Sequence, residues 1–400
     1  ERDRHMYTTS YYTKLLREGK ISRRDFINKT VVVGASLPVA MSLTNQIAMA
    51  DSPNKGGRFR QAITGGSTGD NLDPALIMDM YMANVSFGQL RNNLTEIGSD
   101  GNLIGELAES WDVSDDAMTW TFKLLKGVEF HNGKTLDAED VVASINHHRG
   151  EDSKSAANSI VESIKDIRTD GKDVVIFELS GGSADFPYLL SDFHLSICPA
   201  KDGSIDWQSG VGTGGYVLES FEPGISTETR RNPNYWKEGR AHFDEIETLF
   251  MADVVARTSA LQSGAIDAMT RVDLKTAHLL ERNPELNVIQ TTGNQHQTLP
   301  MLTNVTPFDN NDLRLAVKYA IDREQWLKII ANGYGAIAND HPIGPANTYY
   351  DAEIEQRTYD PDKSKFHLKK AGYDSVDLQL HTADAAFEGA TDGGILLKES

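Results

Sequence analysis

The chain has 400 residues, of which 39% are hydrophobic and 24% are charged, and its formal net charge is −19 at pH 7. This length exceeds what one hydrophobic core usually serves, so at least two lobes are expected. The acidic balance argues against a nucleic-acid binder, which needs a basic patch, and against electrostatic docking on anionic lipid. It is typical of a solvated acidic surface that keeps a protein soluble.

The first fifty residues are expected to be an export signal. An uncharged apolar run of about 13 residues follows Arg23 and Arg24, and this is shorter than the ~20 residues that a membrane-spanning helix needs. The arginine pair with the polar and apolar residues after it resembles a twin-arginine signal. The alternative is a general secretory signal that happens to contain two arginines. Ala-Met-Ala at 48–50 predicts cleavage between Ala50 and Asp51.

Residues 57–64 read as a strand that runs into a glycine-rich loop at 65–71. Such a loop is either a plain turn or a place where backbone N–H groups meet a partner. Leu72-Asp73-Pro74 then leads into an expected helix through Met78 and Met82, whose methionines are expected in the core.

Residues 119–145 alternate in the way that a half-buried strand does and then become helical. Trp120, Phe122 and Leu124 fall on one face of the expected strand. Asn132-Gly133 predicts a tight reversal, and Asp137 predicts a helix cap.

Gly210-Val-Gly212-Thr-Gly214-Gly215 resembles a dinucleotide loop, but that motif must end a strand and open a helix, whereas the residues from Tyr216 to Phe221 predict a strand. Cys198 is the single cysteine, so no internal disulfide can form. It does not stand at the end of the leader, so no lipid anchor is expected. A buried thiol is expected there rather than a nucleophile.

The segment 288–303 is expected to be an extended crossover between lobes. Asn294 and His296 lie in its polar middle, which suits either a cleft wall or a solvent-exposed hinge. Asp360-Pro361 predicts a helix that ends at Gly372. Val376–Leu380 predicts a strand, followed by a loop at 383–389 that carries Phe387. The first residue is Glu1 rather than a methionine, and the sequence stops at Ser400 before the pattern of expected elements is complete. A fragment of a longer chain is therefore expected.

Several motifs together resemble the extracytoplasmic solute-binding proteins of family 5, the receptors of peptide- and nickel-type ABC importers. They are Glu106–Ile145, Leu72-Asp73-Pro74, GTGGY at 212–216, RNPNYW at 231–236, SGAID at 263–267, LRLAVKYAIDRE at 313–324 and YDPDKSKFHLKKAGY at 359–373. They occur in the order found in that family and span most of residues 56–375.

The resemblance implies an α/β fold with two lobes, the periplasmic binding protein fold of type II, in its large peptide-binding class with an inserted subdomain. Residues 1–50 would be the signal peptide, 51–97 and 211–293 lobe I, and 98–210 the inserted subdomain. Residues 294–400 would be an incomplete lobe II, whose return to lobe I is missing. The fragment would then expose apolar surface that the full protein covers.

The resemblance also implies a periplasmic receptor that binds a small molecule or oligopeptide and delivers it to an ABC permease in the inner membrane. Export by the twin-arginine translocase and a monomeric state are expected; no cofactor, metal or catalytic residue is expected. The expected ligand contacts are Thr68, Gly69, Asn158, Asn294, His296 and Phe387.

The class of the solute stays open in the sequence. A peptide is favoured, while an oligosaccharide, an opine, a metal complex or haem are the alternatives within the same receptor role. A secreted hydrolase is the competing class, but no H-E-x-x-H or Walker motif occurs in the sequence. A chaperone or sensor on the same fold is a third reading.

Overall fold

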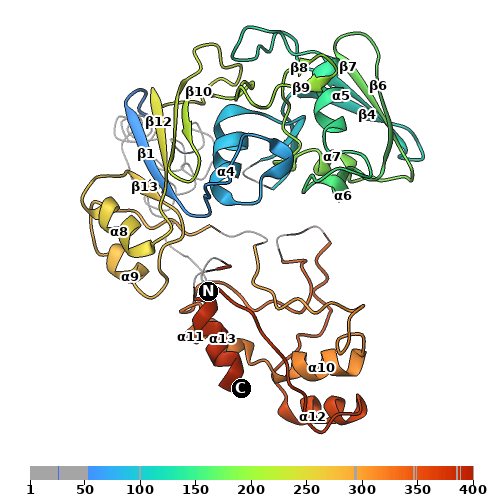
Figure 1. Ribbon diagram of the computed structural model, residues 1–400, viewed down its shortest axis with the longest axis vertical. Helices are drawn as coiled ribbons and strands as arrows, with labels where there is room; N and C mark the ends of the chain where they lie inside the picture. The colour runs from blue at the N-terminus through green and yellow to red at the C-terminus, as the bar shows by residue number, and fades with distance from the viewer. Residues whose placement is uncertain are drawn as a thin grey trace, which may run out of the picture. The chain divides into compact units, whose positions relative to one another are not determined.

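The computed structural model describes Phe26 and residues 53–98, 101–291, 295–345, 347, 349–383, 386–387 and 389–399. Two compact units share the chain (Figure 1). One contains the chain up to Gln61 together with Ser67–Leu249, and the other contains Ala62–Gly66 together with Phe250–Ser400. The lobe and subdomain boundaries given above stay predictions.

One sheet contains, in this spatial order, the strands β10 (Tyr216–Glu222), β11 (Ser226–Arg231), β12 (Glu245–Phe250) and β1 (Arg58–Ile63). The strand expected at 57–64 is β1. Buried threonines on β11 and β12 need partners, and Gln89 supplies them through bonds of 2.8 Å with Thr229 and 2.9 Å with Thr248. β13 (Ala268–Met269), in the second unit, is the next strand of this sheet and is hydrogen-bonded to β1.

The second sheet is antiparallel throughout, in the order β4 (Ala108–Val113), β5 (Thr119–Leu124), β7 (Val174–Leu179) and β6 (Ile164–Thr169). The predicted strand at 119–124 is confirmed as β5, and its three apolar side chains are buried. Helix α5 (Ala138–Asn146) covers this sheet and begins at the predicted cap, whose carboxylate accepts two helix N–H groups.

The core of this sheet comes from one continuous stretch of chain, because its buried members run from Leu94 to Ile197. Phe122 of β5 meets Phe177 of β7 edge-on, with ring centroids 5.5 Å apart, and Phe186 packs against both rings. Smaller elements complete the first unit: β2 (Thr95–Ile97), β3 (Leu103–Gly105), α6 (Asn158–Val161), α7 (Phe186–Leu189), β8 (Ala200–Lys201) and β9 (Ser204–Ile205).

The methionines after Leu72-Asp73-Pro74 divide between core and surface. Helix α4 (Met80–Val85) begins only after its cap Asp79, and Met82 is buried within it. Met78 precedes the cap and is 81% exposed, so placing it in the core was wrong. The helical spacing on which that expectation rested does not extend to Met78.

The glycines at 212–215 open a strand, as predicted. β10 begins directly at Tyr216, so this is not the strand-to-helix turn that a dinucleotide loop requires. Gly212 and Gly214 lie against the backbone of residues 89–91, where a side chain on either would overlap a carbonyl oxygen. Cys198 is buried, which confirms the expected core thiol, and burial raises the pKa of that thiol.

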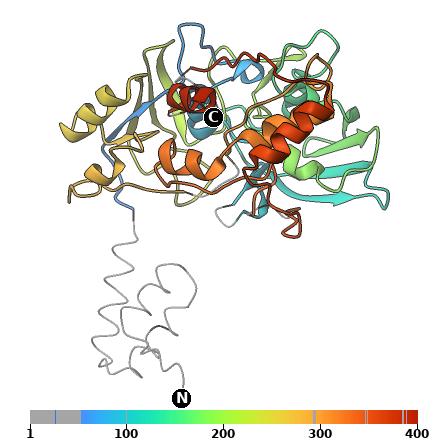
Figure 2. The same cartoon turned by 90° about the horizontal axis from the view of Figure 1, so that it is seen from below.

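Helices dominate the second unit: α8 (Val254–Gln262), α9 (Ala277–Leu280), α10 (Asn311–Ala320), α11 (Arg323–Ile329), α12 (Pro361–Lys370) and α13 (Ala390–Glu399). α10 and α12 lie side by side in both views (Figure 1, Figure 2). Asp312 meets His367 at 2.8 Å, and the His367 ring stacks on Tyr319 with centroids 5.8 Å apart. α12 begins after Asp360 and ends before Gly372, as predicted.

Two segments of the second unit differ from expectation. Val376–Leu380 is not a strand, and the described part of the crossover at 288–303 contains no strand either. Alternating side chains make a strand only where a neighbouring backbone completes the hydrogen bonds, and no described residue does so here. Among the described residues, no helix is long and apolar enough to cross a membrane.

Candidate functional site

The glycine-rich loop at 65–71 is closed by its own hydrogen bonds. The Ser67 amide donates to Asp70 Oδ2 at 2.8 Å, and the Gly69 amide donates to Ser67 Oγ at 3.1 Å. Thr68 and Gly69 are both exposed at its tip. The amide of Gly69 is therefore already used within the loop, so a ligand would meet its backbone through other atoms.

The turn between β10 and β11 packs against the backbone of this loop. Gly224 has φ +70°, and a Cβ at this position would be 2.8 Å from the Thr68 amide nitrogen. Only a residue without a side chain allows the two backbones to approach this closely. Thr68 is thus held against a turn of the same unit.

Asn158 holds together the loop that precedes α6. Its Nδ2 donates to the carbonyl oxygens of His148 at 3.0 Å and Gly150 at 3.2 Å. Ser153 Oγ donates to the same His148 carbonyl at 3.0 Å. The Asn158 amide nitrogen therefore positions the loop, and its role as a ligand contact stays a prediction.

Three histidines lie close together beneath that loop, and two of them pair with aspartates. His147 Nε2 is 2.7 Å from Asp73 Oδ1, and His194 Nδ1 is 2.6 Å from Asp192 Oδ1. Burial lowers the pKa of His194, but the bonds to Asp192 and to a backbone carbonyl outweigh it and raise that pKa above its usual value.

His148 differs from its two neighbours because it is fully buried and has no carboxylate partner in the described part of the chain. Its Nδ1 meets Ser155 Oγ at 2.7 Å, whereas its Nε2 has no hydrogen-bond partner among the described residues. Burial first, and then the nearby His147 and His194, lower the pKa of His148 to about 4. The ring is therefore held neutral inside this unit.

We expect this histidine to make the protein less stable in mild acid. The unfolded chain takes up a proton near the ordinary pKa of 6.5 and the folded chain only near 4, so stability falls as the pH drops through that window. The slope should reach about 1.4 kcal/mol per pH unit. Urea unfolding between about pH 7 and pH 5 measures it. His148→Gln should remove this part of the slope, and His278→Gln, at an exposed position of α9, should not. Equal slopes for all three proteins would contradict this.

In the second unit, His296 is exposed and lies in the irregular segment that begins at residue 295. Its neighbour Gln297 accepts a hydrogen bond of 2.7 Å from Trp326 Nε1 of α11. Trp326 in turn lies beside Phe387, with ring centroids 6.2 Å apart. The structure thus places the crossover segment and the Phe387 loop around one tryptophan, which the sequence analysis missed. Its position in LRLAVKYAIDRE–QW, directly after a family motif, was the available signal.

Trp326 lines a hollow of about 420 Å³. It is lined by Thr298, Leu299, Pro300, Trp326, Leu380, His381, Thr382, Ala383, Ala386, Phe387, Ala390, Gly394 and Leu397. Most of these side chains are apolar, so the hollow suits apolar contact rather than recognition of a charge. Phe387 is in this lining, and its contact with a solute stays a prediction.

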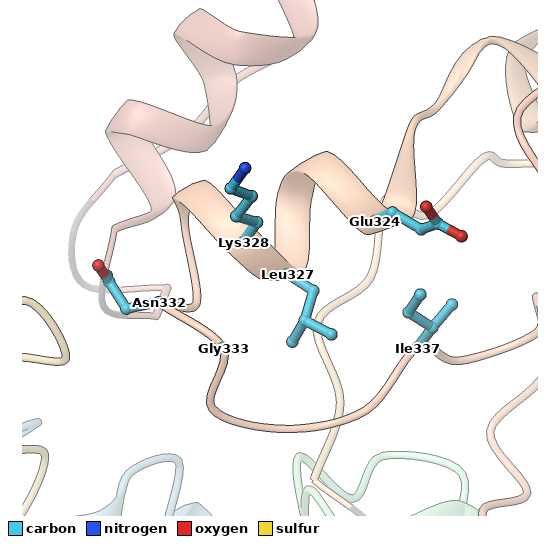
Figure 3. A pocket seen from close by; sticks show the side chains of 6 residues that line it. All are labelled: Glu324, Leu327, Lys328, Asn332, Gly333 and Ile337. Atoms are coloured by element: carbon cyan, nitrogen blue, oxygen red, sulfur yellow. The ribbon is translucent and has the colours of Figure 1, made fainter.

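A second hollow, of about 310 Å³, lies between α11 and the loop after it (Figure 3). Leu327 and Ile337 are its apolar lining residues, and Glu324, Lys328, Asn332 and Gly333 complete the lining. It offers no set of converging polar groups, so we do not assign it a ligand.

Three of the expected functional residues, Arg23, Arg24 and Asn294, lie outside the described residues. Thr68, Gly69 and Asn158 belong to the first unit, and His296 and Phe387 to the second. Their common role in one site stays a prediction. The described residues contain no group of three or more His, Cys, Asp or Glu side chains placed to hold a metal ion.

Residues 102–392 match the family described as "Bacterial extracellular solute-binding proteins, family 5 Middle". The chain belongs to this family. It is 29% identical over 329 residues to heme-binding protein A of Haemophilus influenzae, covering 76% of this chain and 60% of the relative. It is also 29% identical over 317 residues to the glutathione-binding protein GsiB of Pectobacterium atrosepticum, covering 77% of this chain and 60% of the relative. The family 5 chain therefore spans about 60% of the length of these relatives.

The fold is similar to that of the ABC transporter-associated periplasmic binding protein DppA from Helicobacter pylori, solved in complex with the peptide STSA. The TM-score is 0.69 at 27% identity, and the match covers 80% of this chain and 67% of DppA. The predicted fold class, the α/β fold of the two-lobed periplasmic binding proteins, is confirmed.

Proposed function

We propose that this family 5 protein is the periplasmic receptor of an ABC importer and that it binds a peptide-like solute between its two lobes. The observation that carries the proposal is the family match over residues 102–392. Two relatives are named for the solute that they bind, haem in one and glutathione in the other. A receptor of this kind closes because the bound solute makes more contacts in the closed state.

Thr68, Gly69, Asn158, Asn294, His296 and Phe387 are the proposed contacts to the solute. The exposed loop tip in the first unit and the Trp326 hollow in the second support the inclusion of Thr68, Gly69 and Phe387. The alternative is a non-peptide solute in the same role, and haem is favoured among these by the relative in Haemophilus influenzae.

Solute-dependent stabilisation without turnover tests the function. We expect glutathione or tri-alanine at about 100 times its Kd to add about 2.7 kcal/mol of stability, seen as a rise in Tm. Mass spectrometry should recover the peptide intact. His296→Ala should weaken binding by about 1 to 3 kcal/mol if this side chain bonds to the solute, while His278→Ala should not. Cleavage of the peptide would favour a hydrolase, and stabilisation by haem alone would favour the alternative solute.

We further propose that the protein acts as a monomer, without a lipid anchor, and reaches the periplasm through the twin-arginine translocase, with Arg23 and Arg24 as the recognised pair. Lysine keeps the charge but lacks the planar guanidinium group. Secretion of an Arg23→Lys, Arg24→Lys variant at the normal level would contradict this route.

A further inference from the structure

His148 lies just after α5 and holds the connection to α6 by both its backbone and its side chain. Its carbonyl oxygen accepts hydrogen bonds from Ser153 Oγ and Asn158 Nδ2, each at 3.0 Å, and its Nδ1 lies 2.7 Å from Ser155 Oγ. We call residues 150–157 the α5–α6 loop. Three of the bonds that shape this loop therefore meet at one residue.

Ser155 extends this hold to the rest of the α5–α6 loop. Its Oγ accepts from the Ala157 amide at 3.1 Å, and its own amide donates to Ser153 Oγ at 3.2 Å. The ring of His148 is thus the buried end of a short chain of hydrogen bonds. The closed form of the loop depends on this ring staying where it is.

The ring is enclosed in a form that accepts no second proton without cost. It is 0% exposed, and its Nε2 has no hydrogen-bond partner among the described residues. A protonated imidazole donates at both nitrogens, so it would bring a charge and a donor without an acceptor into the interior. Opening of the α5–α6 loop lets water reach the ring, and a proton on the ring therefore favours the open form.

The charged groups around the ring do not compensate such a proton. His147 and His194 face it from the end of α5 and from the segment after α7, and their charge disfavours a charge on His148. The facing carboxylates attract a proton, but Asp73 is already bonded to His147 and Asp192 to His194. The charged residues of the loop itself, at 151, 152 and 154, are exposed. Burial and the two histidines together lower the pKa of His148 to about 4.

We propose that His148 is a proton-operated latch: its neutral ring keeps the α5–α6 loop closed, and its charged ring shifts the loop towards an open form in mild acid. Asn158 is bonded to the same residue, so the latch would control the order of one proposed solute contact. That consequence rests on the proposed function, whereas the latch itself does not.

Hydrogen exchange of the loop amides at pH 7 and pH 5, read by mass spectrometry on the whole protein, tests the latch. The amides of Ala156 and Ala157 are bonded to the Ala75 carbonyl at 2.9 Å and to Ser155 Oγ at 3.1 Å, so their exchange reports opening of the loop. After correction for the intrinsic pH dependence of exchange, their protection should fall about twenty-fold. This is the change expected for a ring that titrates near 6.5 in the open form and near 4 in the closed form.

His148→Gln keeps the backbone carbonyl and a neutral polar side chain, and the pH dependence of loop protection should disappear in this variant. His278→Gln, at an exposed position of α9, is the control and should keep it. Constant loop protection between pH 7 and pH 5 in the wild type would overturn the latch, since the ring would then stay buried whenever the loop moves.

The amides of β7 report how often the core of the same unit unfolds. Loop protection equal to that of β7 at both pH values would also overturn the latch, because the loop would then open only together with the core. Both of these outcomes are read on the wild type, so they decide the matter even if His148→Gln does not fold.

Discussion

Replacing Glu106 by alanine is expected to lower the free energy of unfolding by about 3 to 5 kcal/mol, the cost of breaking a buried ion pair. Glu106 is 2% exposed and accepts bonds of 2.7 Å from both Asn92 Nδ2 and the Asn93 amide. Its carboxylate also meets Lys237 Nζ at 2.6 Å. Removing it takes the acceptor from the Asn93 amide and leaves Asn92 Nδ2 with only a long bond of 3.4 Å to Tyr235 Oη. It also leaves the ammonium group with Glu96 as its one remaining carboxylate partner among the described residues.

The pKa values of Glu106 and Lys237 are both shifted by burial and by the charge of the other group. Burial raises the pKa of Glu106 in spite of the nearby ammonium group. Burial lowers the pKa of Lys237, but Glu106 and Glu96 outweigh it, so that this pKa is raised. The ammonium group therefore stays charged and needs its carboxylates.

Glu109→Ala is the control for this measurement. Glu109 pairs with Lys123 at 3.3 Å, and both side chains are 51% exposed. Exposed pairs contribute little, so the loss should stay within about 0.5 kcal/mol. Urea unfolding of the three proteins gives the comparison. Similar losses for the two variants would show that the buried carboxylate has no special role.

Gly214→Ala is expected to cost about 3 kcal/mol, at the upper end for overpacking, because the three atoms nearest to the new Cβ are all backbone. It would overlap the carbonyl of Gln89 and lie 2.7 Å from the Arg91 amide nitrogen. The Gly214 carbonyl is also fixed, by a 3.0 Å bond from Asn232 Nδ2. The new methyl group therefore has no flexible neighbour that could move aside.

Gly181→Ala provides the comparison, since nothing lies within 4 Å of a Cβ there and its φ is not positive. It should be neutral or slightly stabilising, because alanine restricts the unfolded chain. Chemical denaturation separates the two outcomes. A Gly214→Ala protein as stable as Gly181→Ala would mean that residues 89–91 shift easily.

The sequence was sufficient where the physical cause of an element is local. The alternation at 119–124 was enough to identify a buried strand, because every second side chain faces the core. Asp137 and Asp360 each cap a helix through bonds to residues two or three positions away. The strand after the glycines at 212–215 was likewise visible in its β-branched and aromatic residues.

The sequence was insufficient where the outcome depends on distant residues. Val376–Leu380 alternates like β5 but lacks a described strand beside it. Met78 was expected in the core, but it lies before the start of α4 and its side chain is exposed. The contact between Gln297 and Trp326 joins residues 29 positions apart. The expected site residues were chosen partly by family resemblance, and their assembly into one site stays a prediction.

The two larger sheets of the described residues form at different stages of synthesis. Everything that the core between Leu94 and Ile197 needs has left the ribosome before β12 has been made. Strand β1 must wait, because Arg58 reaches Glu245 across 187 positions. Closing a loop of that size costs roughly 5 kcal/mol of chain entropy. The β4–β7 sheet can therefore fold during translation, whereas the backbone of β1 stays without its neighbour β12 until that strand has been made.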